Sequence, residues 1–145
     1  MSNKDSNPKD VVGSAKPPFT TMPATVLQEV GVAMAEGARK YGAYNWRAIG
    51  VRASVYYDAC FRHLSAWWEG EDVDPDSGCS HITKAIAGLM ILRDSQIQGQ
   101  CTDDRPPKSP EFWMDEAKKQ MTEVIAKYPE AVKPFLESNR NDWEK

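Results

Sequence analysis

Residues 53–97 read "ASVYYDACFRHLSAWWEGEDVDPDSGCSHITKAIAGLMILRDSQI" and contain two helical segments joined by an acidic turn. The first segment, 53–68, should end at Gly70. The second spans roughly 78–97, with Asp76 or Ser77 as its cap, and its apolar residues indicate a central position. The residues expected to be buried are Val55, Ala59, Phe61, Leu64, Ala66 and Trp67 in the first segment, and Ile82, Ile86, Leu89, Met90 and Leu92 in the second.

The flanking segments extend this helical pattern. An apolar stripe (Val26, Leu27, Val30 and Met34) predicts a helix from Ala24 to about Lys40, followed by a loop up to Gly50. The segment before Ala24 is not expected to be helical, because it contains Pro17 and Pro18. Near the other end, Ser109, Pro110 and Glu111 predict a helix start, and this helix should end before Pro129, with a short polar helix after it.

The fold class predicted from these segments is all-α, because neither an alternating strand pattern nor an internal repeat is visible. We expect an extended N-terminal arm (1–23), a helical catalytic core of three helices (24–98), and a linker with a C-terminal helical extension (99–145).

Composition narrows the class of partner. Of 145 residues, 18 are Lys or Arg and 21 are Asp or Glu, giving a net charge of −3. This balance argues against stable nucleic-acid binding but allows a small anionic substrate. No apolar run approaches the roughly 20 residues that span a bilayer, and no signal-peptide pattern is visible. The three cysteines lack metal-site spacing. A cytoplasmic protein with reduced thiols and no membrane contact is expected.

The acidic turn has two interpretations. It places Glu69, Glu71, Asp72, Asp74 and Asp76 within eight positions, next to two tryptophans and just before His81. Composition alone favours a solvated turn. A site for Mg²⁺ or Mn²⁺ would also require such carboxylates. Glu29 lies beside apolar positions, where an unpaired carboxylate is costly, so a cation or metal partner is expected there too.

The segment "GARKYGAYNWR" (37–47) also has two interpretations of equal weight. Its cations and aromatic rings suit a nucleotide's phosphates and base. Alternatively, the cations favour a helix C-terminus and the aromatic loop plugs the bundle.

Four blocks together resemble a known family: "NPKDVVGSAKPP" (7–18), "GARKYGAYNWR" (37–47), "RHLSAWWEGEDVDPDSG" (62–78) and His81. They are similar to the phage dATP/dGTP diphosphohydrolases of the MazZ type, relatives of the MazG-like all-α nucleotide pyrophosphohydrolases. The resemblance covers about residues 7–97. It implies a metal-dependent hydrolase that cleaves dGTP or dATP between the α and β phosphates, releasing the monophosphate and pyrophosphate. It also implies a homo-oligomer, a dimer or tetramer.

MazG-like enzymes hold metal ions with an ExxE pair on one helix and an ExxD pair on the next. Here Val32 follows Glu29 at that spacing, and Lys84 follows His81. The resemblance therefore implies a rebuilt ligand set to which the acidic turn contributes.

The candidate site follows from these expectations. The pool of Mg²⁺ or Mn²⁺ ligands is Glu29, Glu69, Glu71, Asp72, Asp76 and His81. The catalytic group is Glu71, Asp72 and His63, with His63 holding a carboxylate in place. Asp74 is assigned to loop structure. The substrate contacts are Lys16, Lys40 and Arg62 for the phosphates, and Asn45 and Trp46 for the base or sugar.

Two rival functions remain open. One is a non-catalytic helical module for phage or host interaction, with a solvated acidic loop. The other is a metal phosphohydrolase that releases triphosphate from deoxynucleotides. Metal-dependent melting tests the first, and product analysis tests the second.

Overall fold

The computed structural model describes residues 7–143 and is all-α, as the sequence predicts. The chain divides into two compact units, Met1–Arg105 and Pro106–Lys145. The candidate site lies within the first unit, so its helices are described first.

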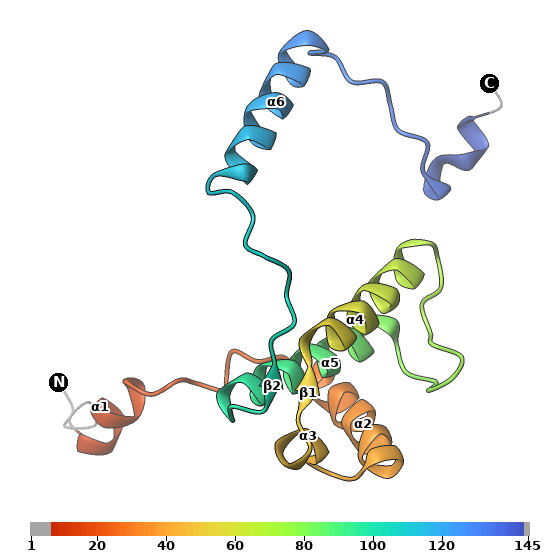
Figure 1. Cartoon of the computed structure of the whole chain (residues 1–145). Helices are drawn as coiled ribbons and strands as arrows, with labels where there is room; N and C mark the ends of the chain where they lie inside the picture. The colour runs from red at the N-terminus through yellow and green to blue at the C-terminus, as the bar shows by residue number, and fades with distance from the viewer. Residues whose placement is uncertain (1–6, 144–145) are drawn as a thin grey trace. The chain divides into compact units, whose positions relative to one another are not determined.

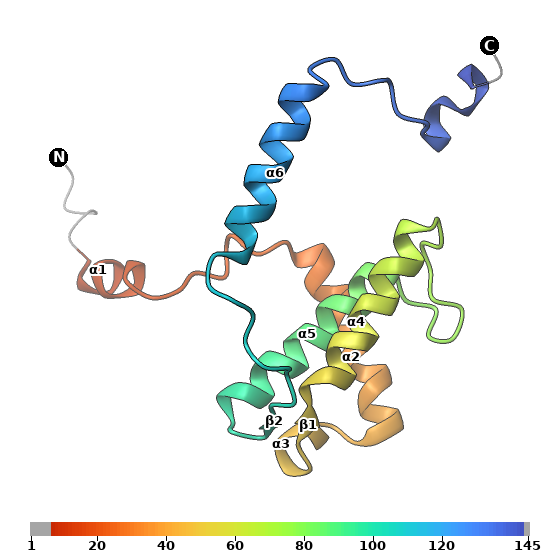
Figure 2. The same cartoon turned by 45° about the horizontal axis from the view of Figure 1, so that its top comes forward.

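Three helices form the centre of the first unit: α2 (Ala24–Tyr41), α4 (Ala53–Trp68) and α5 (His81–Ile97). They lie side by side, and α5 contacts both of the others (Figures 1 and 2). The bounds of α4 agree with the predicted segment, and the central position of α5 is confirmed.

The core between these helices is built from small side chains. Val30 and Ala33 of α2 pack with Ala87 of α5. Cys60 of α4 is also buried, and a Cβ on Gly88 would lie 2.9 Å from its Sγ atom. Small residues therefore let α4 and α5 approach closely.

The burial predicted for large side chains was wrong in several places. Of the residues predicted to be buried, those found exposed are Val55, Phe61, Leu64 and Trp67 on α4, Leu89 and Met90 on α5, and Leu27 on α2. Helical spacing identified an apolar stripe on α4, but the close approach to α5 uses the face that carries Cys60. The stripe is left facing outward.

The start of α5 also differs from the prediction. The helix begins at His81, and Ser80 rather than Asp76 or Ser77 is the cap: its Oγ accepts hydrogen bonds from the backbone N–H groups of Ile82 and Thr83. Residues 74–78 instead form a turn of their own, in which the Asp74 carboxylate accepts from the Ser77 hydroxyl and the Asp76 backbone. The assignment of Asp74 to loop structure fits this geometry.

Two short helices occupy segments predicted to be irregular. α1 (Pro8–Ser14) lies within the arm that was expected to be extended, because the Asn7 side chain caps it and Pro8 opens it. Its residues are not buried. α3 (Asn45–Ala48) lies within the loop after α2 and buries Trp46.

A pair of two-residue strands, which the sequence did not predict, closes the first unit. β1 (Val51–Arg52) pairs in parallel with β2 (Cys101–Thr102). Just beyond β2, the Asp104 carboxylate accepts from both the backbone N–H and the hydroxyl of Ser54. These contacts attach the end of the first unit to the start of α4.

Gly50, immediately before β1, provides a stability test of this pairing. Its φ is +84°, and a Cβ there would lie 2.6 Å from the backbone oxygen of Gln100. Gly50→Ala should lower the free energy of unfolding by roughly 2–4 kcal/mol, because backbone strain and a clash add. Gly99→Ala is the matched control: its φ is +69° but nothing lies within 4 Å of the added Cβ. Denaturant titrations measure both variants. An equal loss of unfolding free energy in Gly50→Ala and Gly99→Ala would contradict a clash between the added Cβ and Gln100.

The second unit contains α6 (Trp113–Lys127) and a 3-10 helix, η2 (Glu137–Asp142). α6 starts at Trp113, three residues after the predicted Pro110 start, because Phe112 adopts a left-handed conformation before it. The helix ends at Lys127, before Pro129, as predicted. Among residues 7–143, no helix combines the length and apolarity needed to cross a bilayer.

Candidate active site

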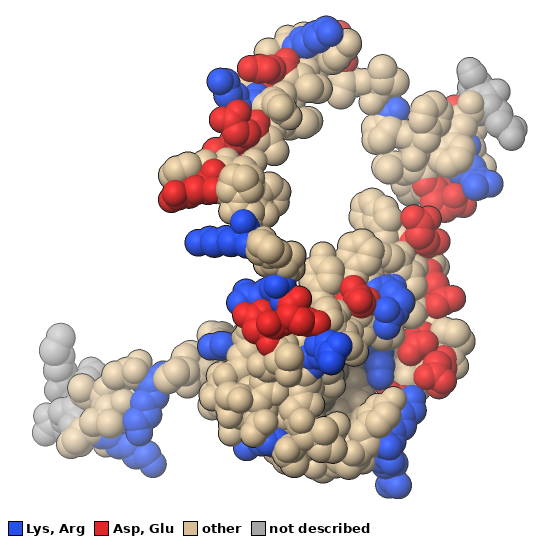
Figure 3. All heavy atoms as spheres, viewed as in Figure 1, with Lys and Arg blue, Asp and Glu red and all other residues tan. Residues whose placement is uncertain are grey.

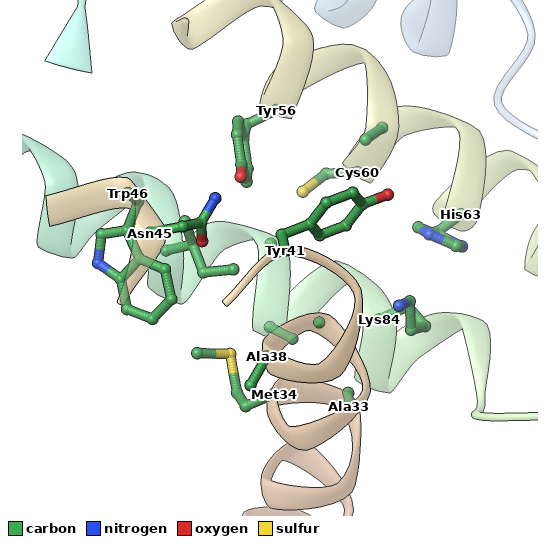
Figure 4. A pocket seen from close by; sticks show the side chains of 15 residues that line it. Ala33, Met34, Ala38, Tyr41, Asn45, Trp46, Tyr56, Cys60, His63 and Lys84 are labelled. Atoms are coloured by element: carbon green, nitrogen blue, oxygen red, sulfur yellow. The ribbon is translucent and has the colours of Figure 1, made fainter. Parts of the chain in front are cut away.

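A cavity of about 250 Å³ lies among α2, α3, α4 and α5 (Figure 4). His63 and Lys84 lie towards one end of it, Asn45 and Trp46 towards the other, and Tyr41 and Cys60 between them. The remaining lining residues are Ala33, Met34, Gly37, Ala38, Tyr56, Ala59, Ala87, Gly88 and Ile91. An apolar cavity with a few convergent polar groups is the usual form of a small-molecule site.

A chain of hydrogen bonds joins the cavity to the acidic turn. The Nδ1 atoms of His63 and His81 are 2.9 Å apart, and Nε2 of His81 lies 2.7 Å from Oε1 of Glu71. His81 is buried, whereas Glu71 is exposed. The backbone N–H of His81 also donates to the Asp72 carbonyl, which fixes the turn against the start of α5.

The environment of His63 favours its neutral form. Burial lowers the pKa of His63 below its ordinary value, and the positive charges of Lys84 and Arg62 act in the same direction. The carboxylate of Asp74 partly opposes this effect. A neutral imidazole at the cavity wall can accept a proton.

An ion-pair network crosses the same end of the bundle. The Glu36 carboxylate contacts the ammonium groups of Lys40 at 2.5 Å and Lys84 at 2.6 Å. These two lysines hold the pKa of Glu36 below its usual range. Lys40 also pairs with Asp76 at 3.3 Å, which links α2 to the acidic turn.

Trp46 is both buried and hydrogen-bonded. Its Nε1–H donates to the Asp94 carboxylate at 2.6 Å, and Arg47 donates to both oxygens of the same group. Arg47, followed by Trp46, lowers the pKa of Asp94 to about 2. The Arg47 guanidinium also lies over the Tyr44 ring. These contacts support the interpretation in which the aromatic loop fills the end of the bundle. Trp46 also lines the cavity, so it is positioned to contact a ligand there.

The predicted site residues are thus only partly brought together. His63, Asn45 and Trp46 line the cavity, and His81 and Glu71 connect to it through His63. Lys40 and Asp76 pair with each other but are not among the lining residues. Lys16, Glu29, Arg62 and Glu69 are exposed, and in the described part of the chain they are not among the lining residues. The expectation that Glu29 lies against apolar residues was wrong, because α2 turns Val30 inward and Glu29 outward.

The acids of the turn do not form one cluster. Asp and Glu side chains lie along the α4–α5 loop (Figure 3), and three of them have separate partners: Glu71 contacts His81, Asp74 the turn backbone, and Asp76 Lys40. Glu69 and Asp72 are exposed.

The predicted metal ligands do not converge in the described part of the chain. Among residues 7–143, no three His, Cys, Asp or Glu side chains are grouped so that they could hold an ion. His63 and Glu71 approach opposite ring nitrogens of His81, so the three cannot share one ion in this arrangement. A dependence on Mg²⁺ or Mn²⁺ remains a prediction, and no reaction step is assigned to a metal.

Three charged residues of this region were not among the predicted site residues. Glu36 and Lys84 form an ion pair across 48 positions of sequence. Asp94 accepts a hydrogen bond from Trp46 across the same separation. The available signal was a charged residue within an apolar helix, since Lys84 and Asp94 interrupt the apolar run of α5.

The fold and cavity define a class: a small all-α protein whose interior site carries an imidazole chain and an ammonium group. The chain belongs to the family described as dATP/dGTP diphosphohydrolase, N-terminal, whose model matches residues 6–105. This match confirms the resemblance to the dATP/dGTP diphosphohydrolases.

One relative is a dATP/dGTP diphosphohydrolase of Salmonella phage PMBT28. It is 31% identical to this chain over 90 residues, which cover 62% of the chain and 30% of the relative. The matched part is therefore less than a third of that protein's length. No solved structure matches this chain.

Proposed function

We propose that this chain hydrolyses dGTP and dATP to the monophosphate and pyrophosphate. The family match and the name of the phage relative support a substrate of this class. The observation that carries the proposal is the Glu71–His81–His63 chain, which ends at a cavity large enough for part of a nucleotide. At about 250 Å³, this cavity is close to the lower end of typical ligand pockets.

The hydrogen-bond chain specifies where a proton can be accepted. The ionised Glu71 carboxylate only accepts, so Nε2 of His81 carries a proton. In the neutral state, Nδ1 of His81 therefore accepts from the Nδ1–H group of His63. This leaves Nε2 of His63 with a free lone pair, so this atom is the proposed general base.

The proposed reaction is a displacement at the α-phosphate. The oxygen of a water molecule forms a bond to the α-phosphorus, and the bond from that phosphorus to the oxygen bridging to the β-phosphate breaks. The proton of the water passes to Nε2 of His63, and pyrophosphate leaves. Glu71 stabilises the imidazolium charge through His81.

A panel of deoxynucleoside triphosphates, incubated with Mg²⁺ or Mn²⁺ and separated by nucleotide chromatography, tests this proposal. We expect dGMP and dAMP together with pyrophosphate. Release of inorganic triphosphate would instead identify the rival hydrolase. Absence of any product with all four substrates would favour the non-catalytic interaction module.

Metal dependence has a separate test on the acidic turn. We propose Mg²⁺ or Mn²⁺ as the cofactor, and a formed site should raise the melting temperature in millimolar Mn²⁺ by mass action. Asp72→Asn should remain folded and lose most of this shift, because an amide neutralises a cation less well than a carboxylate. Asp10→Asn, on α1, is the control. If Asp72→Asn shows the full Mn²⁺-induced rise in melting temperature, the acidic turn is a solvated loop and not a metal site.

We also propose a homo-oligomer, in which a second copy covers an exposed apolar face of α4 that includes Phe61 and Leu64 of the outward stripe together with Tyr57 and Trp68. Tyr57, Phe61, Leu64 and Trp68 recur at helical spacing and are 44–78% exposed. Aromatic side chains bury about 150–250 Å² each, so this stripe is substantial for a 16-residue helix. The same stripe on two copies can pack across a two-fold axis. Sedimentation velocity measures whether the chain is a monomer, dimer or tetramer.

A further inference from the structure

Lys84 has a distinct position in the cavity. In the described part of the chain, it is the one Lys or Arg side chain among the lining residues. Its side chain is 21% exposed, and its ammonium group donates to Oε2 of Glu36 at 2.6 Å. An ammonium group has three donors, so two remain for a ligand in the cavity.

Two other cations close to the cavity, Lys40 and Arg47, are more fully neutralised. Lys40 is shared between Glu36 and Asp76, and the contact with Glu36 raises its pKa. Arg47 is held by both oxygens of Asp94. Lys84 contacts one carboxylate, which itself is shared with Lys40.

The arrangement along the cavity matches the parts of a nucleotide. Figure 4 places Lys84 beside His63 and away from Trp46 and Asn45. An ammonium next to the proposed base suits the phosphates, and the aromatic and amide end suits the base and sugar.

We infer that Lys84 anchors the polyphosphate chain of the substrate, and that Glu36 is the positioning residue that holds its ammonium group at the cavity wall. The inference rests on the proposed function for the identity of the ligand. It assigns the phosphates to the Lys84 end of the cavity and the purine to the Trp46 end.

The test uses the full chain and inorganic tripolyphosphate, with affinity measured by calorimetry. Lys84→Met should weaken binding on the order of ten- to a hundredfold, as expected for a lost charge-assisted hydrogen bond. Lys84→Arg should restore most of the affinity. Glu36→Gln should weaken binding by less, and Glu36→Asp should restore it. Arg93→Met, an exposed cation on the same helix, is the control. Melting curves identify any unfolded variant, and Lys84→Gln replaces Lys84→Met if that protein does not fold.

Unchanged affinity in folded Lys84→Met or Lys84→Gln, or no tripolyphosphate binding by the wild type, overturns the inference. The proposed function fails separately. If the wild type binds tripolyphosphate through Lys84 but hydrolyses no deoxynucleotide, the role of Lys84 in binding is supported and the proposed hydrolysis is rejected. If the wild type hydrolyses dGTP and Lys84→Met binds tripolyphosphate normally, the proposed hydrolysis is supported and the role of Lys84 in phosphate binding is rejected.

Discussion

His63→Gln is expected to reduce hydrolysis of dGTP and dATP about 100- to 10,000-fold, the usual contribution of a positioned general base. Glutamine retains a polar side chain of similar length, so contact with His81 can persist and the protein should stay folded. It cannot take up the proton released by the attacking water. Single-turnover rates at saturating nucleotide measure the effect on the chemical step.

Asp58→Asn is the matched control, because Asp58 is an exposed polar residue on the same helix. Its turnover should equal that of the wild type. If folded His63→Gln also retains full turnover, His63 is not the base, and the hydrogen-bond chain has only a structural role.

The pH dependence of turnover provides a second check on His63. Burial lowers its pKa below the ordinary value of 6.5. The base acts in its neutral form, so activity should be present above that ordinary value and fall as the pH drops through the lowered pKa. The same sign holds for stability, because protonation is less favourable in the folded protein than in the unfolded chain. An acid limb with its midpoint above 6.5 would contradict the assignment.

Trp46→Ala is expected to destabilise the protein by about 3–5 kcal/mol, the typical cost of removing a buried large aromatic side chain. Trp46 is only 8% exposed, and its indole donates to Asp94. Truncation would leave a void between α3 and α5 and remove one partner of that carboxylate. Chemical denaturation, monitored by circular dichroism, measures the loss.

Trp46→Phe separates packing from hydrogen bonding. It keeps an aromatic ring and leaves the Arg47 contacts of Asp94 intact, so a loss of about 1–2 kcal/mol is expected. A folded Trp46→Phe protein also allows nucleotide affinity to be measured without the confounding loss of stability. A change of less than about half a kcal/mol in Trp46→Ala, typical of a surface site, would exclude the plug interpretation.

The helices were predictable where local signals agreed. Apolar spacing and the Gly70 stop gave the bounds of α4, and the apolar content of α5 indicated its central place. The start of α5 was missed because several capping residues precede it, and the Asp74 turn decides that Ser80 is the cap. β1 and β2 are too short to give an alternating pattern, and they pair across 50 positions of sequence.

The sequence allowed several residues of the site to be identified, but it did not predict which of them contact one another. The acidic turn and His81 are adjacent in sequence, so their proximity followed directly from the chain. Their separate partners did not: Asp76 reaches Lys40 and Glu36 reaches Lys84 because α2 and α5 lie side by side. Side-chain periodicity gives an apolar face but cannot specify which helix covers it.

The sequence by itself determined the all-α class, the three central helices and the family, because these depend on local periodicity and on residues close together in the chain. Only the tertiary structure decided that His63 faces His81, that Trp46 is held by Asp94, and that the stripe of α4 faces outward. The physical reason lies in the close packing of α4 on α5. The small residues Cys60 and Gly88 let one face of α4 approach α5 closely, and that face brings His63 to His81.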